Sequence, residues 1–138
     1  MAGQEQLAYQ AAQLMTQNPD YLGRELYRAA LRDCHLMEEA LRAKRWDQLV
    51  NAGSHAQQIF AGLHDITRQD TREGQVFRNF NRHLWQRINQ VLQRHEEQPL
   101  QEVREALNEA IRQLDLRLSG EPSVAASGGG RLGDGWLG

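Results

Sequence analysis

The chain has little that could crosslink it or hold it in a membrane. Its 138 residues include a single cysteine, Cys34, so no disulfide can form within the chain, and a lone thiol is typical of a reducing compartment. No apolar run approaches the ~20 residues that span a bilayer, and the first ten residues lack the basic and apolar regions of a signal peptide. We therefore expect a soluble, cytoplasmic protein without membrane insertion.

An excess of charge of one sign is also missing. The formal net charge is −2, whereas a dedicated nucleic-acid binder is usually strongly basic, because neutralising phosphates supplies much of its affinity. We therefore expect no nucleic-acid partner. Proline and β-branched residues are sparse, while Gln, Glu, Arg, Leu and Ala are abundant. This composition favours helices.

Apolar residues recur at three- and four-residue steps through four long segments, which predicts four amphipathic helices. The four run from Pro19 to about Ala43, from Asp47 to Ile66, through Val76 to Leu92, and from Gln98 to Leu118. A shorter stripe over Gln4 to Met15 predicts an extra N-terminal helix, which is too short to be stable alone in water. We expect that short helix to lie across the others.

Residues suited to helix ends mark where the predicted helices begin. Asn18 can cap the first long helix, with Pro19 at its first position, and Asp47 can cap the second. Asp70 followed by Glu73 fits a capping box before the third. Gly53 lies inside the second long helix, where it costs ~1 kcal/mol relative to alanine. It therefore indicates a close helix crossing.

Charge and connection length predict how the helices pack. Residues 68–95 carry six Arg and two acidic residues, and residues 96–121 carry seven acidic residues and three Arg. The short connection makes the last two helices antiparallel neighbours, and their opposite charges favour that pairing modestly. The expected fold is all-α: an antiparallel four-helix bundle with a short extra N-terminal helix.

The periodicity stops at Ser119, where a segment rich in Gly and Ser begins. Such a composition buries too little apolar surface to fold. We therefore expect a helical-bundle domain over residues 1–118 and a flexible, disordered tail over residues 119–138. Leu132, Trp136 and Leu137 are apolar exceptions in that tail, and the alternative is that they form a short anchor on a flexible tether.

Constellations that carry catalysis or bind metals are not found. His35 lies near two glutamates but has no matching cluster on another helix, whereas di-iron bundles need Glu-x-x-His on facing helices. Cys34 falls on an apolar stripe, where a buried structural thiol is favoured over a nucleophile. We expect no enzyme activity, no metal and no cofactor. What remains is a binding module in which a groove between helices accepts a partner helix.

Several segments resemble, in order and spacing, the FliS-type flagellin export chaperones. Residues 16–27, Thr-Gln-Asn-Pro-Asp-Tyr-Leu-Gly-Arg-Glu-Leu-Tyr, are similar to the T-x-S-P-x-x-L-x-x-x-L-Y stretch that opens the family's second helix. Ala8–Gln10 resembles the family's Tyr-Gln segment, Ala56–Leu63 its A-x-x-I-I-x-x-L helix, and Gly74–Leu92 its G-x-x-x-x-N-L-x-x-L-Y segment. The likeness runs collinearly from about Leu7 to Leu118. Glu25, Arg28, Ala29 and Trp85 depart from the family pattern.

The resemblance implies a cytoplasmic chaperone that binds the C-terminal segment of flagellin in apolar grooves. It would prevent early polymerisation and deliver flagellin to a component of the flagellar type III export gate. The partner-binding residues that it implies are Leu7, Tyr9, Leu22, Leu26, Tyr27, Ile59 and Leu63. Residues 45–50 match a FliT-type chaperone more weakly. The alternative is therefore a FliT-type or other structural or regulatory helical bundle without flagellin binding, and a homodimer is possible in either case.

Overall fold

The computed structural model describes residues 18–120, which form four long helices. These are α2 (Pro19–Ala43), α3 (Trp46–Ile66), α4 (Arg72–Arg94) and α5 (Gln98–Leu118). Their bounds agree closely with the four helices predicted from apolar periodicity. The short N-terminal helix predicted over Gln4 to Met15 and the tail beyond residue 120 lie outside the described residues.

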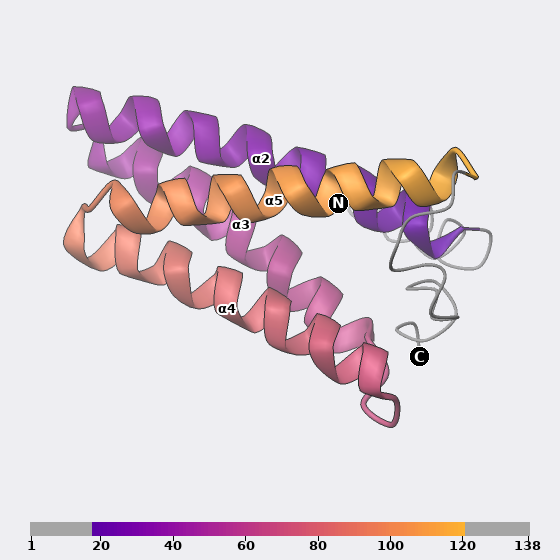
Figure 1. Ribbon diagram of the computed structural model, residues 1–138. Helices are drawn as coiled ribbons and strands as arrows, with labels where there is room; N and C mark the ends of the chain where they lie inside the picture. The colour runs from indigo at the N-terminus through magenta and orange to yellow at the C-terminus, as the bar shows by residue number, and fades with distance from the viewer. Residues whose placement is uncertain (1–17, 121–138) are drawn as a thin grey trace, which may run out of the picture.

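Each helix runs antiparallel to the next, so the four form an up-down-up-down bundle (Figure 1). α2 packs against both α3 and α5, and α4 packs against α3 and α5. The α2–α5 pair and the α3–α4 pair diverge toward the end where α2 begins and α5 ends (Figure 1). The predicted antiparallel bundle, including the neighbouring last two helices, is therefore confirmed.

The first helix begins as predicted, but the next two use different caps. The Asn18 side chain accepts a hydrogen bond from the Tyr21 N–H at 3.2 Å, and Pro19 occupies the first turn. α3 begins at Trp46 with Arg45 at the N-cap position and no side-chain cap, so the prediction of Asp47 as N-cap is wrong. Asp47 lies one residue inside the helix, where its negative charge favours the helix N-terminus.

The N-cap of α4 is Thr71 rather than Asp70. The Thr71 hydroxyl oxygen accepts the N–H of Gly74 at 3.0 Å. Asp70 instead accepts two hydrogen bonds from the Arg68 guanidinium, at 2.9 and 2.8 Å. The capping box predicted from Asp70 and Glu73 is therefore wrong by one position, because a nearby arginine holds the carboxylate that the pattern assigned to the helix.

The two helix connections at the narrow end of the bundle contact each other. Lys44 and His95 end α2 and α4 in the left-handed backbone region, each with a φ of 56°. The rings of Trp46 and His95 stack 4.0 Å apart and nearly parallel. This contact joins the α2–α3 connection to the α4–α5 connection, so both helix pairs are held together at this end.

The core contains one buried polar pair among its apolar side chains. Tyr27 is fully buried, and its ring lies about 6 Å from those of Phe60, Phe77 and Phe80. Its hydroxyl donates to Asn81 Oδ1 at 2.8 Å, and burial raises the pKa of Tyr27 far above its usual value. Asn81 Nδ2 in turn donates to the Phe77 carbonyl at 3.0 Å, so the buried polar atoms of this pair are satisfied.

The crossing predicted at Gly53 is confirmed. A Cβ at this position would lie 2.6 Å from Leu92 Cδ2 on α4, closer than real carbon contacts allow. Glycine at residue 53 thus lets α3 and α4 approach one another, which offsets the ~1 kcal/mol that glycine costs inside a helix.

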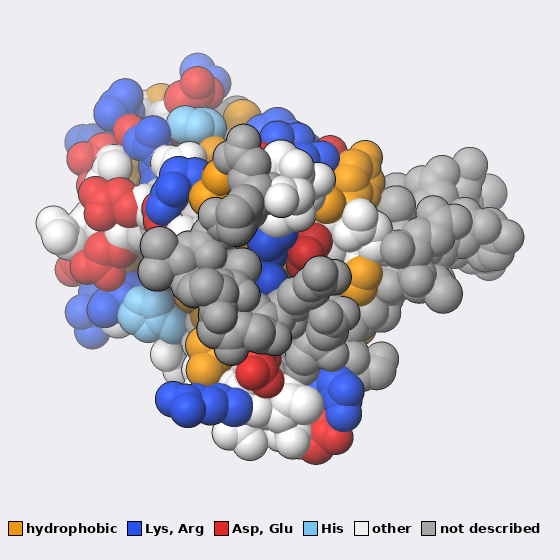
Figure 2. Space-filling view, turned by 45° about the vertical axis from the view of Figure 1, so that its right-hand side comes forward, with side chains coloured by type: hydrophobic (Ala, Val, Ile, Leu, Met, Phe, Trp, Pro, Cys, Tyr) orange, Lys and Arg blue, Asp and Glu red, His pale blue; other side chains and the backbone are white. Residues whose placement is uncertain are grey.

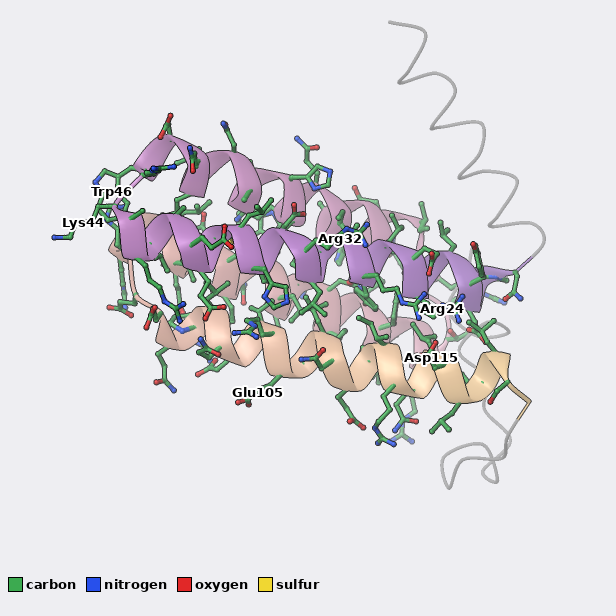
Figure 3. All side chains as sticks on the ribbon, turned by 90° about the horizontal axis from the view of Figure 1, so that it is seen from above. Arg24, Arg32, Lys44, Trp46, Glu105 and Asp115 are labelled. Carbon is green, nitrogen blue, oxygen red and sulfur yellow. The ribbon has the colours of Figure 1, made fainter. Side chains whose placement is uncertain are left out.

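Ion pairs link α5 to both of its neighbours. Arg87 on α4 pairs with Glu102 at 2.9 Å, as the opposite charges of these helices predict. Arg24 on α2 pairs with Asp115 at 3.0 Å, and the two residues lie side by side in Figure 3. All of these side chains are partly exposed, so each pair contributes only about 0–1 kcal/mol. They favour the observed neighbours, and the apolar core supplies most of the stability.

The single thiol is a buried part of the core, in agreement with the sequence analysis. Cys34 has no exposed surface, and burial together with the negative charge of Asp33 raises its pKa to about 12. Because the folded protein covers the thiol, we expect a thiol reagent to modify Cys34 far more slowly in the native protein than in denaturant. Equal rates in the two states would contradict the buried position.

Candidate functional site: a groove between α2 and α3

An open apolar groove lies between the first turns of α2 and the last turns of α3. Its volume is about 300 Å³. Leu22 and Leu26 stand one turn apart on α2, and Ile59, Leu63 and Ile66 follow one another at helical spacing on α3. Side chains at such spacing share one face of a helix, so the two stripes face each other across the groove.

The groove has a closed floor and open walls. Leu22 and Leu63 are 3% and 1% exposed and form the floor, while Leu26, Ile59 and Ile66 are partly buried. Gly62 opens one edge, because no atom lies within 4 Å of the position that a Cβ would occupy there. The groove therefore leaves apolar side chains partly open to solvent while the bundle beneath it stays packed.

The structure gathers four of the predicted partner-binding residues in this one groove: Leu22, Leu26, Ile59 and Leu63. Tyr27, the fifth predicted residue in the described range, lies in the core with no exposed surface and cannot contact a partner in this structure. Leu7 and Tyr9 lie outside the described residues. Core residues and groove residues recur at the same helical spacing. The apolar periodicity of the sequence therefore could not distinguish the buried Tyr27 from the groove residue Leu26.

Sequence reasoning missed several residues of the groove. Ile66 continues the spacing of Ile59 and Leu63, so that stripe could have identified it. His55, Gln58 and Gly62 carry no apolar signal, and they join the site only because of where α3 lies against α2.

A second hollow, of about 360 Å³, continues along the same two helices, and most of the residues that line it are of polar types. It is lined by Asp33, Leu36, Glu39, Gln48, Asn51, Ala52 and His55. His55 also lines the apolar groove, so the two hollows meet at this residue. Leu36 is 55% exposed at the rim. The α2–α3 face is therefore apolar near the start of α2 and more polar toward the α2–α3 connection.

A close pair of polar side chains stands at this boundary. His55 Nδ1 lies 2.6 Å from Asp33 Oδ2, and the Asp33 side chain is only 10% exposed. Burial raises the pKa of Asp33, and the hydrogen bond and charge of His55 act in the opposite direction. Because a buried carboxylate is costly without a partner, the ring of His55 is what allows Asp33 to lie beneath the face.

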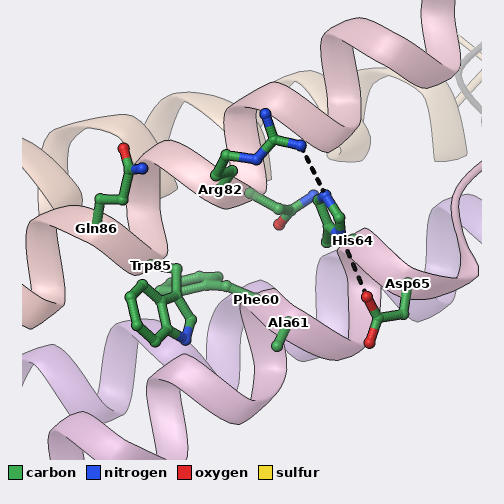
Figure 4. A pocket seen from close by; sticks show the side chains of 8 residues that line it. Phe60, Ala61, His64, Asp65, Arg82, Trp85 and Gln86 are labelled. Atoms are coloured by element: carbon green, nitrogen blue, oxygen red, sulfur yellow. Dashed lines mark hydrogen bonds and ion pairs between the residues drawn. The ribbon is translucent and has the colours of Figure 1, made fainter. Parts of the chain in front are cut away.

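A further hollow, of about 310 Å³, lies between α3 and α4 (Figure 4). Phe60 and Ala61 from α3 and Trp85 from α4 give it an apolar part, and Trp85 is 38% exposed. His64 Nε2 lies 3.3 Å from the Arg82 guanidinium, and His64 Nδ1 lies 3.1 Å from Asp65. This hollow contains none of the residues predicted to bind a partner.

Within residues 18–120, no group of three or more His, Cys, Asp or Glu is placed to hold a metal ion. None of the four helices is long and apolar enough to cross a membrane. Figure 2 shows apolar side chains at the surface among charged side chains of both signs. Such a surface can hold a complementary segment through apolar contacts with a charged rim.

Comparison with known proteins places the chain in a family. A family model described as flagellar protein FliS matches residues 1–114, which is most of the chain. No curated protein matches the sequence. The match covers all of α2, α3 and α4 and nearly all of α5, and these are the helices that build the groove and support it. The chain belongs to the FliS family of flagellar chaperones.

Proposed function

We propose that this protein is a cytoplasmic export chaperone that binds the C-terminal segment of flagellin in the α2–α3 groove. The observation that carries this proposal is the meeting of Leu22, Leu26, Ile59 and Leu63 in one open apolar groove. The FliS family is a chaperone family rather than an enzyme family. Binding, with no chemical step, is therefore the function that this groove serves.

The shape of the groove suits a helical segment. An amphipathic helix binds such a groove by laying residues at three- and four-residue spacing against it, which is the spacing that the walls present. A flagellin segment that folds on binding loses conformational entropy, and burying its apolar face offsets that loss. While the face is buried it cannot pair with other flagellin molecules, and this is how binding would prevent early polymerisation.

Other parts of the proposal concern residues beyond the described helices and further partners. Leu7 and Tyr9 would contribute to the same binding site. The domain over residues 1–118 would carry the activity, with residues 119–138 dispensable for folding. The complex would then be delivered to a component of the flagellar type III export gate. Light scattering on the free and bound protein would distinguish a monomer from the homodimer that is also possible.

Leu26→Ala tests the groove against an equivalent position outside it. Leu26 and Leu92 are both partly buried leucines packed against the core, and only Leu26 lines the groove. Because both side chains are only partly buried, both alanine variants should lose less unfolding free energy than the about 2–5 kcal/mol of a core leucine. Only Leu26→Ala should weaken binding of the flagellin C-terminal segment, by roughly tenfold or more, because buried methyl groups contribute about 0.8 kcal/mol each.

Calorimetric titration of that segment into the wild type and both variants, with denaturant melts alongside, measures the two effects separately. Absence of binding to the wild type would refute the proposed function and favour a FliT-type or other interaction bundle without flagellin binding. Equal binding by Leu26→Ala and the wild type would place the flagellin site elsewhere on the chaperone.

A further inference from the structure

The Asp33–His55 pair on the α2–α3 face stands where the apolar groove passes into the more polar second hollow. His55 is the one residue that lines both, and its side chain is 57% exposed, whereas that of Asp33 is only 10% exposed. A segment that follows this face from one hollow to the other must pass over the His55 ring. The pair is therefore a fixed polar point inside a largely apolar path.

The hydrogen bond to Asp33 determines which atom of His55 faces the path. Nδ1 is held by the Asp33 carboxylate at 2.6 Å. The other ring nitrogen, Nε2, forms no hydrogen bond with any residue of the described range, and more than half of the side chain is exposed. Because Nδ1 is anchored, the ring cannot turn freely, and Nε2 offers a hydrogen bond in a constant direction.

We propose that His55, oriented by Asp33, is a specificity-determining residue that sets the register of the bound segment. Through Nε2 it would hydrogen-bond one uncharged polar side chain, such as Ser, Thr, Asn or Gln, which follows the apolar residues of a helical ligand. This inference rests on the proposed function, because it concerns the same groove and the same flagellin segment.

The energetic reason is the cost of a wrong register. If the segment slipped by one turn, about 5.4 Å, an apolar side chain would cover His55 and leave Nε2 without a hydrogen bond. A polar group that is desolvated without a partner is costly, whereas a satisfied one contributes only modestly. The Asp33–His55 pair would thus contribute more to discrimination between registers than to affinity. A groove without a polar atom lacks this penalty for an unmade hydrogen bond.

A coupling experiment tests this directly. The probe is the C-terminal flagellin segment of the same organism, with each of its polar residues replaced by alanine in turn, titrated into wild type and His55→Leu. In the wild type, one replacement should weaken binding by roughly five- to tenfold, the range expected of a single hydrogen bond. The same replacement should have no effect on binding to His55→Leu, because the partner nitrogen is already gone.

Two further variants separate register from simple packing. His55→Gln places an amide near the position of Nε2 and should restore the coupling in part. His35→Leu replaces an exposed histidine of α2 that lines neither hollow, and it should leave the coupling intact. Thermal melts of all variants confirm that each is folded.

The outcomes are distinct. Coupling of no peptide position to His55, or equal coupling in His55→Leu and wild type, would overturn the register role while leaving flagellin binding established. Failure of the wild type to bind the segment at all would refute the proposed function, and the register role would fall with it.

Discussion

Tyr27→Ala is expected to lower the free energy of unfolding by about 3–5 kcal/mol, the cost of removing a large aromatic side chain from a core. The Tyr27 ring has no exposed surface and packs against three phenylalanines contributed by α3 and α4. Its removal would leave a cavity at the place where α2 meets the other two helices. Denaturant melts measure the loss, and a change below 1 kcal/mol would contradict the core position.

Tyr27→Phe separates the hydroxyl from the ring. It keeps the packing but leaves the Asn81 side-chain oxygen buried without its 2.8 Å hydrogen bond. An unsatisfied buried polar atom costs about 1–3 kcal/mol. Tyr21→Phe, on the same helix but outside the core cluster, is the matched control and should change stability by less than about 0.5 kcal/mol. Equal effects of the two substitutions would show that the hydroxyl of Tyr27 contributes nothing specific.

Gly74→Ala is the second substitution with a large expected effect. Alanine normally stabilises a helix relative to glycine by ~1 kcal/mol. Here, however, the added Cβ would clash with the backbone carbonyl oxygen of Arg68, and backbone cannot move aside as a side chain can. The turn before α4 would have to shift, which typically costs about 1–3 kcal/mol. We therefore expect a net loss of stability.

Gly62→Ala is the control for that prediction, since it makes the same change inside α3. No atom lies within 4 Å of the new Cβ, so the intrinsic preference of the helix for alanine should prevail and raise stability by about 0.5–1 kcal/mol. Thermal or denaturant melts of both variants show whether stability falls for Gly74→Ala and rises for Gly62→Ala. A gain in stability for Gly74→Ala would show that the turn at Arg68 is free to relax.

Helix positions followed from the sequence because local rules determine them. Asn18 and Pro19 begin α2 as expected, since a side-chain cap and a fixed φ act within three residues. The predicted N-caps of α3 and α4 were wrong because several polar residues lie near the N-terminus of each helix. Before α4 the outcome depended on a competing partner, because the Arg68 guanidinium binds the Asp70 carboxylate.

The groove was harder to predict than the helices. Leu26 and Tyr27 are consecutive residues with similar hydrophobicity, yet one lines a groove and the other is fully buried. Periodicity identifies the apolar face of α2, but it does not say how far α3 stands from that face at each turn. The Asp33–His55 pair was missed for a related reason, because its residues lie 22 positions apart on different helices.

The order of the helices also bears on how quickly the binding surface forms. Both walls of the groove belong to consecutive helices joined by only two residues, Lys44 and Arg45. Closing so short a loop costs little chain entropy, and bundles rich in local contacts fold within microseconds to milliseconds. Of the four packed helix pairs in the described chain, only α2–α5 is not consecutive in sequence. The groove therefore requires only the pairing of two consecutive helices, which is a local step in the assembly of the bundle.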